Sequence, residues 1–249
     1  MKAYKFLAVA SVLTSTALAQ TPGFFVSAGG GVARINVGSF TVYNPDASIQ
    51  GQPQGEALGA VDRKDNVSVA RLTAGYTVNE NWDVRLSYTG YGTGEAKVAF
   101  PLYTGYAWGV GGGAPTFQRH VLKYKTTALT LMPSYTYAAG EKSRVILGAG
   151  INYGMTTSHF EETYITGASV APVYRIPTSF SYAEETDHSL GYILSLGFSR
   201  LITDNFSAEV TGNYSTFKTK VPTSPWATRS KSSVSATALS AELALIWHW

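Results

Sequence analysis

The segment Ala241-Glu242-Leu243-Ala244-Leu245-Ile246-Trp247-His248-Trp249 places an apolar or aromatic side chain at every second position and stops on an aromatic residue. Alternate side chains of a β-strand point to opposite faces, so this spacing gives the segment one apolar face. Leu243, Leu245, Trp247 and Trp249 share that face, and Glu242 lies on the other. We expect this strand to be the last element of the fold and to complete a closed β-barrel.

Residues 1–19 have the layout of a secretory signal peptide. Two lysines precede an apolar stretch at 6–13, and Ala17-Leu18-Ala19 forms an A-x-A cleavage pattern. The apolar stretch is far shorter than the roughly 20 residues of a membrane-spanning helix, and no Cys stands at the cleavage site to carry a lipid. We therefore expect 1–19 to be removed and 20–249 to form one exported β-barrel domain.

Composition narrows the class of protein further. Without the two lysines of the signal peptide, 17 of the 19 basic residues remain against 16 acidic ones. This balance gives no reason to expect a nucleic-acid partner. Only 14% of residues are charged, whereas ordinary soluble domains are about 25% charged. Because the chain has no cysteine, ladder hydrogen bonds and burial must hold the exported fold together.

Eight segments of the chain alternate with a period of two, and long and short connections alternate between them. These segments are 23–36, 67–78, 82–92, 123–137, 144–158, 187–200, 205–217 and 233–249. Each is at least as long as the roughly 9–11 residues that a tilted strand needs to cross a bilayer. The pattern predicts an all-β fold: a transmembrane up-and-down antiparallel barrel of eight strands, with short periplasmic turns and long extracellular loops.

The two faces of these segments differ in composition. One face collects large apolar residues, among them Val84, Leu86, Leu129, Leu131, Leu147, Ile151, Leu190, Leu194, Leu196, Val210, Leu239 and Leu243. The opposite face carries mostly Gly, Ser, Thr and Ala. A soluble lipocalin-like barrel also alternates, with its apolar face inside, but its outer face would carry many Lys and Glu. Small residues suit the narrow interior of an eight-stranded barrel, so we expect the apolar face to meet lipid.

Aromatic residues gather near both ends of the segments. Toward the short turns lie Tyr76, Trp82, Tyr135, Phe198, Phe206 and Trp247, and toward the long loops lie Tyr88, Tyr91, Tyr153, Tyr214 and Phe217. Ordinary strand packing explains any single one of them. Two belts around an aliphatic band are typical of two membrane–water interfaces.

The chain resembles the eight-stranded outer-membrane β-barrel family that includes the OmpA transmembrane domain and OmpX. The phrase GYTVNENW at 75–82 is echoed by GFSRLITDNF at 197–206, each with a Gly-aromatic strand end, a short turn, and Asn before the aromatic of the next strand. The hairpin at 135–144 lacks the Asn-aromatic pair, and Trp249 replaces the Phe that is more usual at this end. The resemblance implies an outer-membrane monomer inserted by the barrel assembly machinery, with Leu243, Leu245, Trp247 and Trp249 as the assembly signal.

Few charges fall on the inward face of the expected strands. Arg71, Arg85, Glu209 and Glu242 lie mid-strand, and Asp83 and Arg144 lie nearer the periplasmic end. A lone charge inside a narrow barrel is costly, so we expect opposite charges to pair there. The pattern fits two interpretations: a polar plug or gate that controls leakage, and a structural ion-pair network that fills the interior.

The expected loops carry contrasting chemistry. The third loop is acidic, with Glu161, Glu162, Glu184 and Glu185, and the fourth is basic, with Lys218, Lys220, Arg229 and Lys231. The opposite charges fit either docking of the two loops on one another or contact of the basic loop with outer-membrane lipid and the anionic groups of lipopolysaccharide, and solvated loop charge is the remaining alternative. Exposed aromatic loops on a rigid barrel suit adhesion to a host or surface ligand.

The sequence contains no phosphate loop, zinc-ligand spacing or hydrolase elbow, and no cofactor or metal is expected. We expect a non-enzymatic protein that acts in envelope integrity or in surface interaction through its loops. The alternatives are a narrow channel for small or apolar solutes and a lipid A-modifying enzyme. Pro133 cannot donate to a ladder, so it predicts a bulge in the strand at 123–137.

Overall fold

A computed structural model describes residues 22–38, 41–43, 57–59, 63–101, 116–166, 177–222 and 231–249. The predicted signal peptide at 1–19 and about half of the predicted loop residues lie outside these ranges. All regular secondary structure in the described ranges is β-strand. They contain no helix that is long and apolar enough to cross a membrane.

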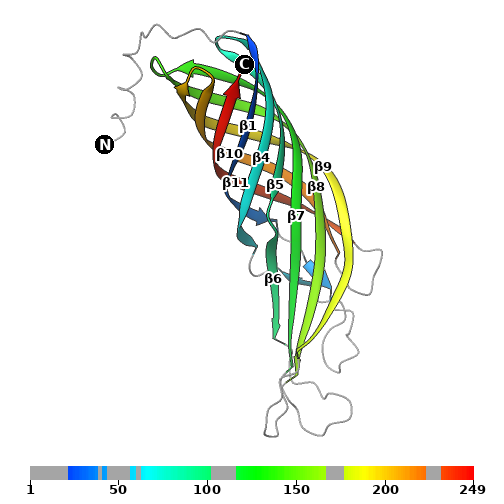
Figure 1. The fold of residues 1–249 in the computed structure, drawn as a ribbon. Coiled ribbons are helices and arrows are strands. Elements are labelled where there is room, and N and C mark those ends of the chain that lie inside the picture. The colour runs from blue at the N-terminus through cyan, green and yellow to red at the C-terminus, as the bar shows by residue number, and fades with distance from the viewer. Residues whose placement is uncertain are drawn as a thin grey trace, which may run out of the picture.

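Figure 1 shows the strands wrapped into a tilted barrel. Their bounds are β1 Gly23–Val37, β2 Thr41–Tyr43, β3 Ala57–Gly59, β4 Lys64–Asn79, β5 Trp82–Tyr91, β6 Gly94–Pro101, β7 Thr116–Ala138, β8 Ser143–Thr166, β9 Pro177–Thr203, β10 Phe206–Pro222 and β11 Lys231–His248. Strands β2 and β3 pair only with each other. The remaining strands follow the order β5-β4-β1-β11-β10-β9-β8-β7-β6.

The barrel is closed because β5 also pairs with β7. β5 and β6 are successive stretches of one wall strand, since both pair with β7 and the register moves by one residue between Gly90↔Thr127 and Gly94↔Tyr124. The eight-stranded antiparallel barrel predicted from the sequence is confirmed. Hydrophobic alternation located each wall strand because it repeats in every one of them.

The short turns and both ends of the described chain lie at the same end of the barrel, which we call the turn end. The connections at 80–81, 139–142 and 204–205 are all at this end. The Trp249 backbone N–H donates to the Phe24 carbonyl oxygen at 3.2 Å, which ties the two ends of the described chain together. The opposite end, which we call the loop end, is where β7, β8 and β9 extend beyond the other strands (Figure 1).

The large apolar side chains predicted to face lipid point outward. Leu190 is 72% exposed and Leu239 is 61% exposed, and the predicted aromatic belts follow the same face with two exceptions. Tyr91 and Phe217 were expected in the belt near the long loops, but they are 2% and 3% exposed and face the interior. Their rings contact each other edge to face with centroids 5.5 Å apart. The belt assignment was wrong for both, because position near a strand end does not determine which face a side chain takes.

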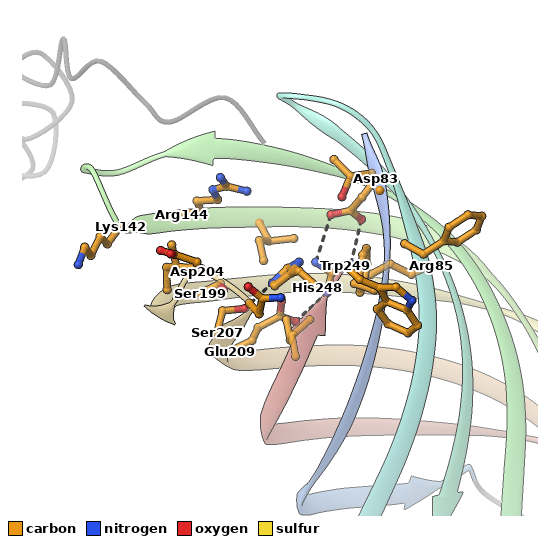
Figure 2. A pocket seen from close by; sticks show the side chains of 18 of the residues that line it. Asp83, Arg85, Lys142, Arg144, Ser199, Asp204, Ser207, Glu209, His248 and Trp249 are labelled. Atoms are coloured by element: carbon orange, nitrogen blue, oxygen red, sulfur yellow. Dashed lines mark hydrogen bonds and ion pairs between the residues drawn. The ribbon is translucent and has the colours of Figure 1, made fainter. Parts of the chain in front are cut away.

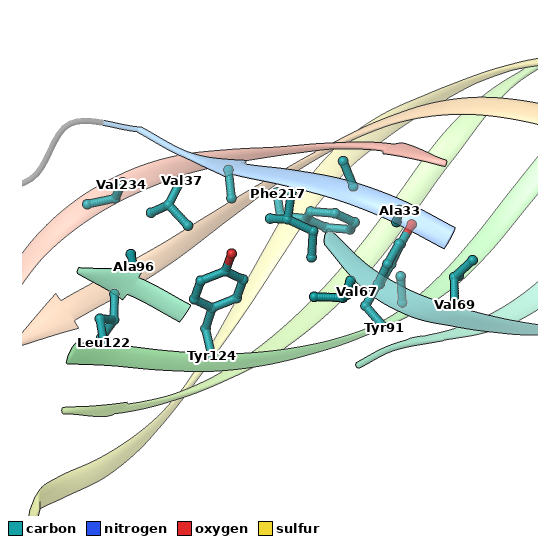
Figure 3. Packing of buried hydrophobic residues seen from close by; sticks show 14 residues of the cluster. Ala33, Val37, Val67, Val69, Tyr91, Ala96, Leu122, Tyr124, Phe217 and Val234 are labelled. Carbon is teal, nitrogen blue, oxygen red and sulfur yellow. The ribbon is translucent and has the colours of Figure 1, made fainter. Parts of the chain in front are cut away.

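The interior of the loop half is apolar, whereas small and polar residues were expected throughout. A cluster of buried residues from six wall strands and β6 fills this half, and we call it the apolar layer (Figure 3). Its members are Ala33, Ile35, Val37, Val67, Val69, Tyr91, Ala96, Leu122, Tyr124, Ala128, Phe217, Val234, Ala236 and Ala238. Burial of these side chains away from water stabilises the barrel from inside.

Pro133 does not produce the predicted bulge in β7. The pairs Leu131↔Ile151 and Ser134↔Gly148 with β8 keep one register on either side of the proline. On the other side of β7, Val84 pairs with Pro133 in an unbroken ladder. Because proline has no backbone N–H, it removes one donor from the ladder between β7 and β8. No residue is added to the strand at this point, and the strand stays extended.

Candidate functional site: the barrel interior

Arg71 and Glu242 form an ion pair near the middle of the barrel. Arg71 Nη2 donates to Glu242 Oε1 at 3.0 Å, and the two side chains are 12% and 3% exposed. Arg71 Nε donates to Thr89 Oγ1 at 3.1 Å. The same Glu242 oxygen accepts from Asn213 Nδ2 at 2.9 Å and from Ser240 Oγ at 2.5 Å. We call these five residues the central ion layer, in which the carboxylate has enough donors to be buried in charged form.

Arg85 forms a second ion layer closer to the turn end. Its Nη1 donates to Glu209 Oε1 at 2.7 Å, and its Nε and Nη2 donate to the two oxygens of Asp83 at 2.9 and 3.2 Å. The planar guanidinium suits this forked contact with a carboxylate. Asp83, Arg85 and Glu209 are each less than a tenth exposed. We call these three residues the turn-side ion layer.

Phe25 covers the turn-side ion layer. The Arg85 guanidinium carbon lies 5.5 Å from the centroid of the Phe25 ring, which is the arrangement of a cation–π contact. A Cβ at position 75 would lie 2.0 Å from this ring, so Gly75 of the repeated Gly-aromatic phrase leaves room for it. His248 completes the surroundings of Phe25, and its Nε2 shares a hydrogen bond of 2.9 Å with Ser207 Oγ.

A cavity of about 360 Å³ opens from the turn-side ion layer toward the turn end, and we call it the mouth cavity. Figure 2 shows Asp83, Arg85 and Glu209 at its base, with Arg144, Asp204 and Trp249 also lining it. The space between the two ion layers is much smaller, about 20 Å³. That volume holds about one water molecule.

The four mid-strand charges predicted from the sequence thus meet as two separate ion pairs, one in each layer. Asp83, predicted nearer the periplasmic end, belongs to the turn-side ion layer. Sequence reasoning missed Asn213, Ser240 and Phe25, although strand alternation places all three on the inward face. No charge marks these residues in the sequence, so the charge pattern alone did not select them.

The four residues predicted as the assembly signal all point outward on β11 and at its end. Leu243, Leu245, Trp247 and Trp249 are between half and two-thirds exposed. The Trp247 ring stacks on Phe206 with centroids 5.7 Å apart, and the Trp249 ring lies 5.7 Å from Trp247. The arrangement is a continuous aromatic strip at the turn end of the outer wall.

The described residues include no group of three or more His, Cys, Asp or Glu placed to hold a metal ion. His188 lies on the outer face of β9, where its Nδ1 shares a hydrogen bond of 2.9 Å with Tyr153 Oη and the two rings stack. The adjacent Ser189 is buried, so the two side chains take opposite faces of the strand.

Comparison with known proteins assigns the family. The profile of the family described as "Outer membrane protein beta-barrel domain" matches residues 6–245. Among solved structures, the chain is similar to Neisserial surface protein A, with 13% identity, a TM-score of 0.46, and 91% of this chain and 97% of that chain covered. It is also similar to OprG from Pseudomonas aeruginosa, with 13% identity, a TM-score of 0.42, and coverage of 91% and 96%. No curated protein sequence matches it. On the strength of the profile match over nearly its whole length, the chain belongs to the outer membrane protein beta-barrel domain family and resides in the cell outer membrane.

Proposed function

We propose that this protein is a closed outer-membrane barrel that binds a partner outside the cell through the sheet formed by β6, β7, β8 and β9. The observation that carries the proposal is strand length. β7, β8 and β9 have 23, 24 and 27 residues, whereas about 9–11 tilted residues cross a bilayer. From Tyr153, which is exposed in the belt near the loop end, β8 runs on to Thr166, roughly 40 Å at the usual rise per residue.

The sheet supports a binding role because it offers a strand edge. The ladder between β9 and β10 ends at Ile193↔Ser215, whereas β9 stays paired with β8 as far as Pro177. Beyond that pair, the Tyr192 backbone N–H donates to Thr216 Oγ1 at 3.1 Å and the Lys218 backbone N–H donates to Ser189 Oγ at 3.0 Å, so β10 still lies beside β9 there. Within the described residues, β9 has no partner strand on this side from 177 to 186. Such an edge accepts an extended segment of another protein by backbone pairing.

The packed interior favours this role over the alternative of a narrow channel. A solute crossing the barrel would meet the apolar layer, the central ion layer and the turn-side ion layer in succession. The described part of the lumen leaves only about 20 Å³ between the two ion layers. We therefore propose that the four inward charges form a structural ion-pair network that fills the interior.

The experiment shortens the sheet and leaves the barrel intact. Ser158 and Glu185 are register partners, so replacing residues 159–184 by Asn-Gly closes the β8–β9 hairpin with a two-residue turn. The matched control replaces residues 223–230 by Asn-Gly between the partners Pro222 and Lys231. Bacteria displaying each form are compared for attachment to epithelial monolayers and to a basement-membrane matrix, with folding checked by heat-modifiable migration.

We expect the β8–β9 truncation to lose attachment and the control to retain it. Attachment that survives the truncation contradicts the proposal, and so does equal loss in the control. Detergent sensitivity of the same cells tests the envelope-integrity alternative: sensitivity caused by the truncation, with attachment unchanged, assigns the extended sheet to the envelope and overturns surface binding.

A further inference from the structure

The mouth cavity faces the periplasm and has no part in the extracellular binding proposed above. We propose that it binds a small organic cation of the linear polyamine class, with one terminal ammonium group on Glu209 and the other at the periplasmic rim. The inference is independent of the extended sheet, because the two features lie at opposite ends of the barrel (Figures 1 and 2).

Glu209 is a buried acid in the lining of the mouth cavity. Its Oε1 accepts from Arg85 at 2.7 Å, but its Oε2 is buried and has no hydrogen-bond partner in the described structure. The residue is 4% exposed and lines the mouth cavity. Leaving a buried carboxylate oxygen without a donor is costly. An ammonium group carries three donors and a positive charge, so it satisfies this oxygen better than a neutral ligand does.

The wall of the mouth cavity carries more acidic than permanently basic side chains. Four carboxylates line the mouth cavity, against three side chains that carry a permanent positive charge, and the difference is one negative charge. The carboxylates are Asp83, Glu141, Asp204 and Glu209, and the cations are Arg85, Lys142 and Arg144. Arg85 is already bound to Asp83 and Glu209. A cavity with this balance of charge concentrates cations over anions.

Two carboxylates of the mouth cavity, those of Asp204 and Glu209, lie at different depths. Asp204 lies in the turn at 204–205, and Glu209 lies three residues inside β10, which begins at Phe206. Three residues of strand span about 10 Å, so the two carboxylates lie at the rim and at the base of one cavity. Between them Ile246, which pairs with Ser207 of β10, offers apolar surface, which suits the methylene chain of a polyamine.

The test uses the mature full-length protein in detergent micelles and titrates it with spermidine in a calorimeter. We expect saturable binding that weakens at least tenfold in Glu209→Gln and measurably in Asp204→Asn. Glu80→Gln is the matched control, since it removes a carboxylate from a turn at the same end that does not line the cavity. Binding to the control should equal that of the wild type. Propylamine, with one ammonium group, should bind at least tenfold more weakly than spermidine.

Several results overturn the proposal. Absence of spermidine binding does so directly, as does wild-type affinity in both Glu209→Gln and Asp204→Asn. Propylamine binding as tightly as spermidine overturns recognition of two ends, and displacement of spermidine by an equal concentration of Mg²⁺ overturns the choice of an organic cation. Asp204 is exposed in a turn, so Asp204→Asn carries the test by itself if Glu209→Gln does not fold.

Discussion

Arg71 on β4 and Glu242 on β11 meet across β1, with Arg71 Nη2 and Glu242 Oε1 3.0 Å apart. The β1 residues that pair with them are Gly29, opposite Arg71, and Gly31, opposite Glu242. Neither glycine presents a side chain to the lumen, so the long side chains of the neighbouring strands cover β1 and reach each other. The ion pair therefore spans both interfaces of the first strand, including the β1–β11 seam that joins the two ends of the chain.

Removing one partner of this pair should cost far more than removing both. Arg71→Met leaves Glu242 as an uncompensated buried charge, and Glu242→Met does the same to Arg71, so each should lower the free energy of unfolding by about 3–5 kcal/mol. The double variant should lie closer to the wild type than either single variant does. Urea titration of the protein in lipid vesicles, followed by tryptophan fluorescence, measures the three changes.

Arg34→Met is the control for the loss of an arginine, because Arg34 lies on the outer face of β1. Its effect should be small beside that of Arg71→Met. Additive effects of the two single variants in the double variant would contradict the pairing, since residues in direct contact are expected to couple.

The close approach at Gly31 should make the seam sensitive to a single methyl group. A Cβ at Gly31 would lie 1.9 Å from the Ala241 carbonyl oxygen, a backbone atom that cannot move aside without shifting β11. At Gly212 the nearest atoms lie 4.0 Å away. We expect Gly31→Ala to destabilise the barrel by about 1–3 kcal/mol, as overpacking does, and Gly212→Ala to be tolerated. Equal midpoints of urea unfolding for the two variants would refute the tight seam.

The fold was predictable because lipid selects one face of every wall strand. The same row of large apolar residues at every second position occurs on different strands, as Leu194, Leu196 and Phe198 on β9 and as Leu243, Leu245 and Trp247 on β11. Each row is a weak signal alone, but the eight wall strands together make a strong one. The loop ends of β7, β8 and β9 were predicted too short for the opposite reason. Outside the membrane neither face has to be apolar, so a strand there loses the alternation that reveals it.

The interior was predictable only in part. Arg71, Arg85, Glu209 and Glu242 stand out because charges are rare on an inward face, but which acid meets which base depends on strand stagger, which the sequence does not encode locally. Tyr91 is separated from Asp83 and Arg85 by an even number of residues, so strand alternation predicts that it faces inward with them. It was instead assigned to the outer belt because it lies near a loop. No local sequence pattern indicated the mouth cavity, because its walls come from the ends of seven strands and from two turns.

The Tyr91–Phe217 contact should be a principal stabilising element of the apolar layer. Phe217→Ala and Tyr91→Ala each remove a large buried ring and should cost about 3–5 kcal/mol. The outward Tyr88, 53% exposed, is the control, and Tyr88→Ala should cost clearly less. In a double-mutant cycle the two inward rings should show a coupling of about 0.5–1.5 kcal/mol. A coupling of zero would mean that the edge-to-face contact adds nothing to burial.

The protein should be electrically silent in planar bilayers. Three layers block the lumen in series, so opening one of them leaves the others in place. We expect no discrete openings from the wild type and none from the Tyr91→Ala/Phe217→Ala double variant, in which both ion layers remain. Openings in the wild type that disappear on substitution of Arg71 or Glu209 would show that the ion layers form a conducting path and would overturn the closed barrel.

Trp249 should affect insertion in cells more than it affects the stability of the finished barrel. Its side chain is 67% exposed at the turn end, so Trp249→Ser removes little buried area, whereas an assembly signal requires the aromatic group to be read before folding. We expect slower appearance of the heat-modifiable form in cells and unchanged refolding from urea into micelles. Trp82→Ser is the matched control, since Trp82 is 48% exposed at the same end but lies outside the last strand. The same delay in both variants would assign the effect to interfacial anchoring rather than to recognition.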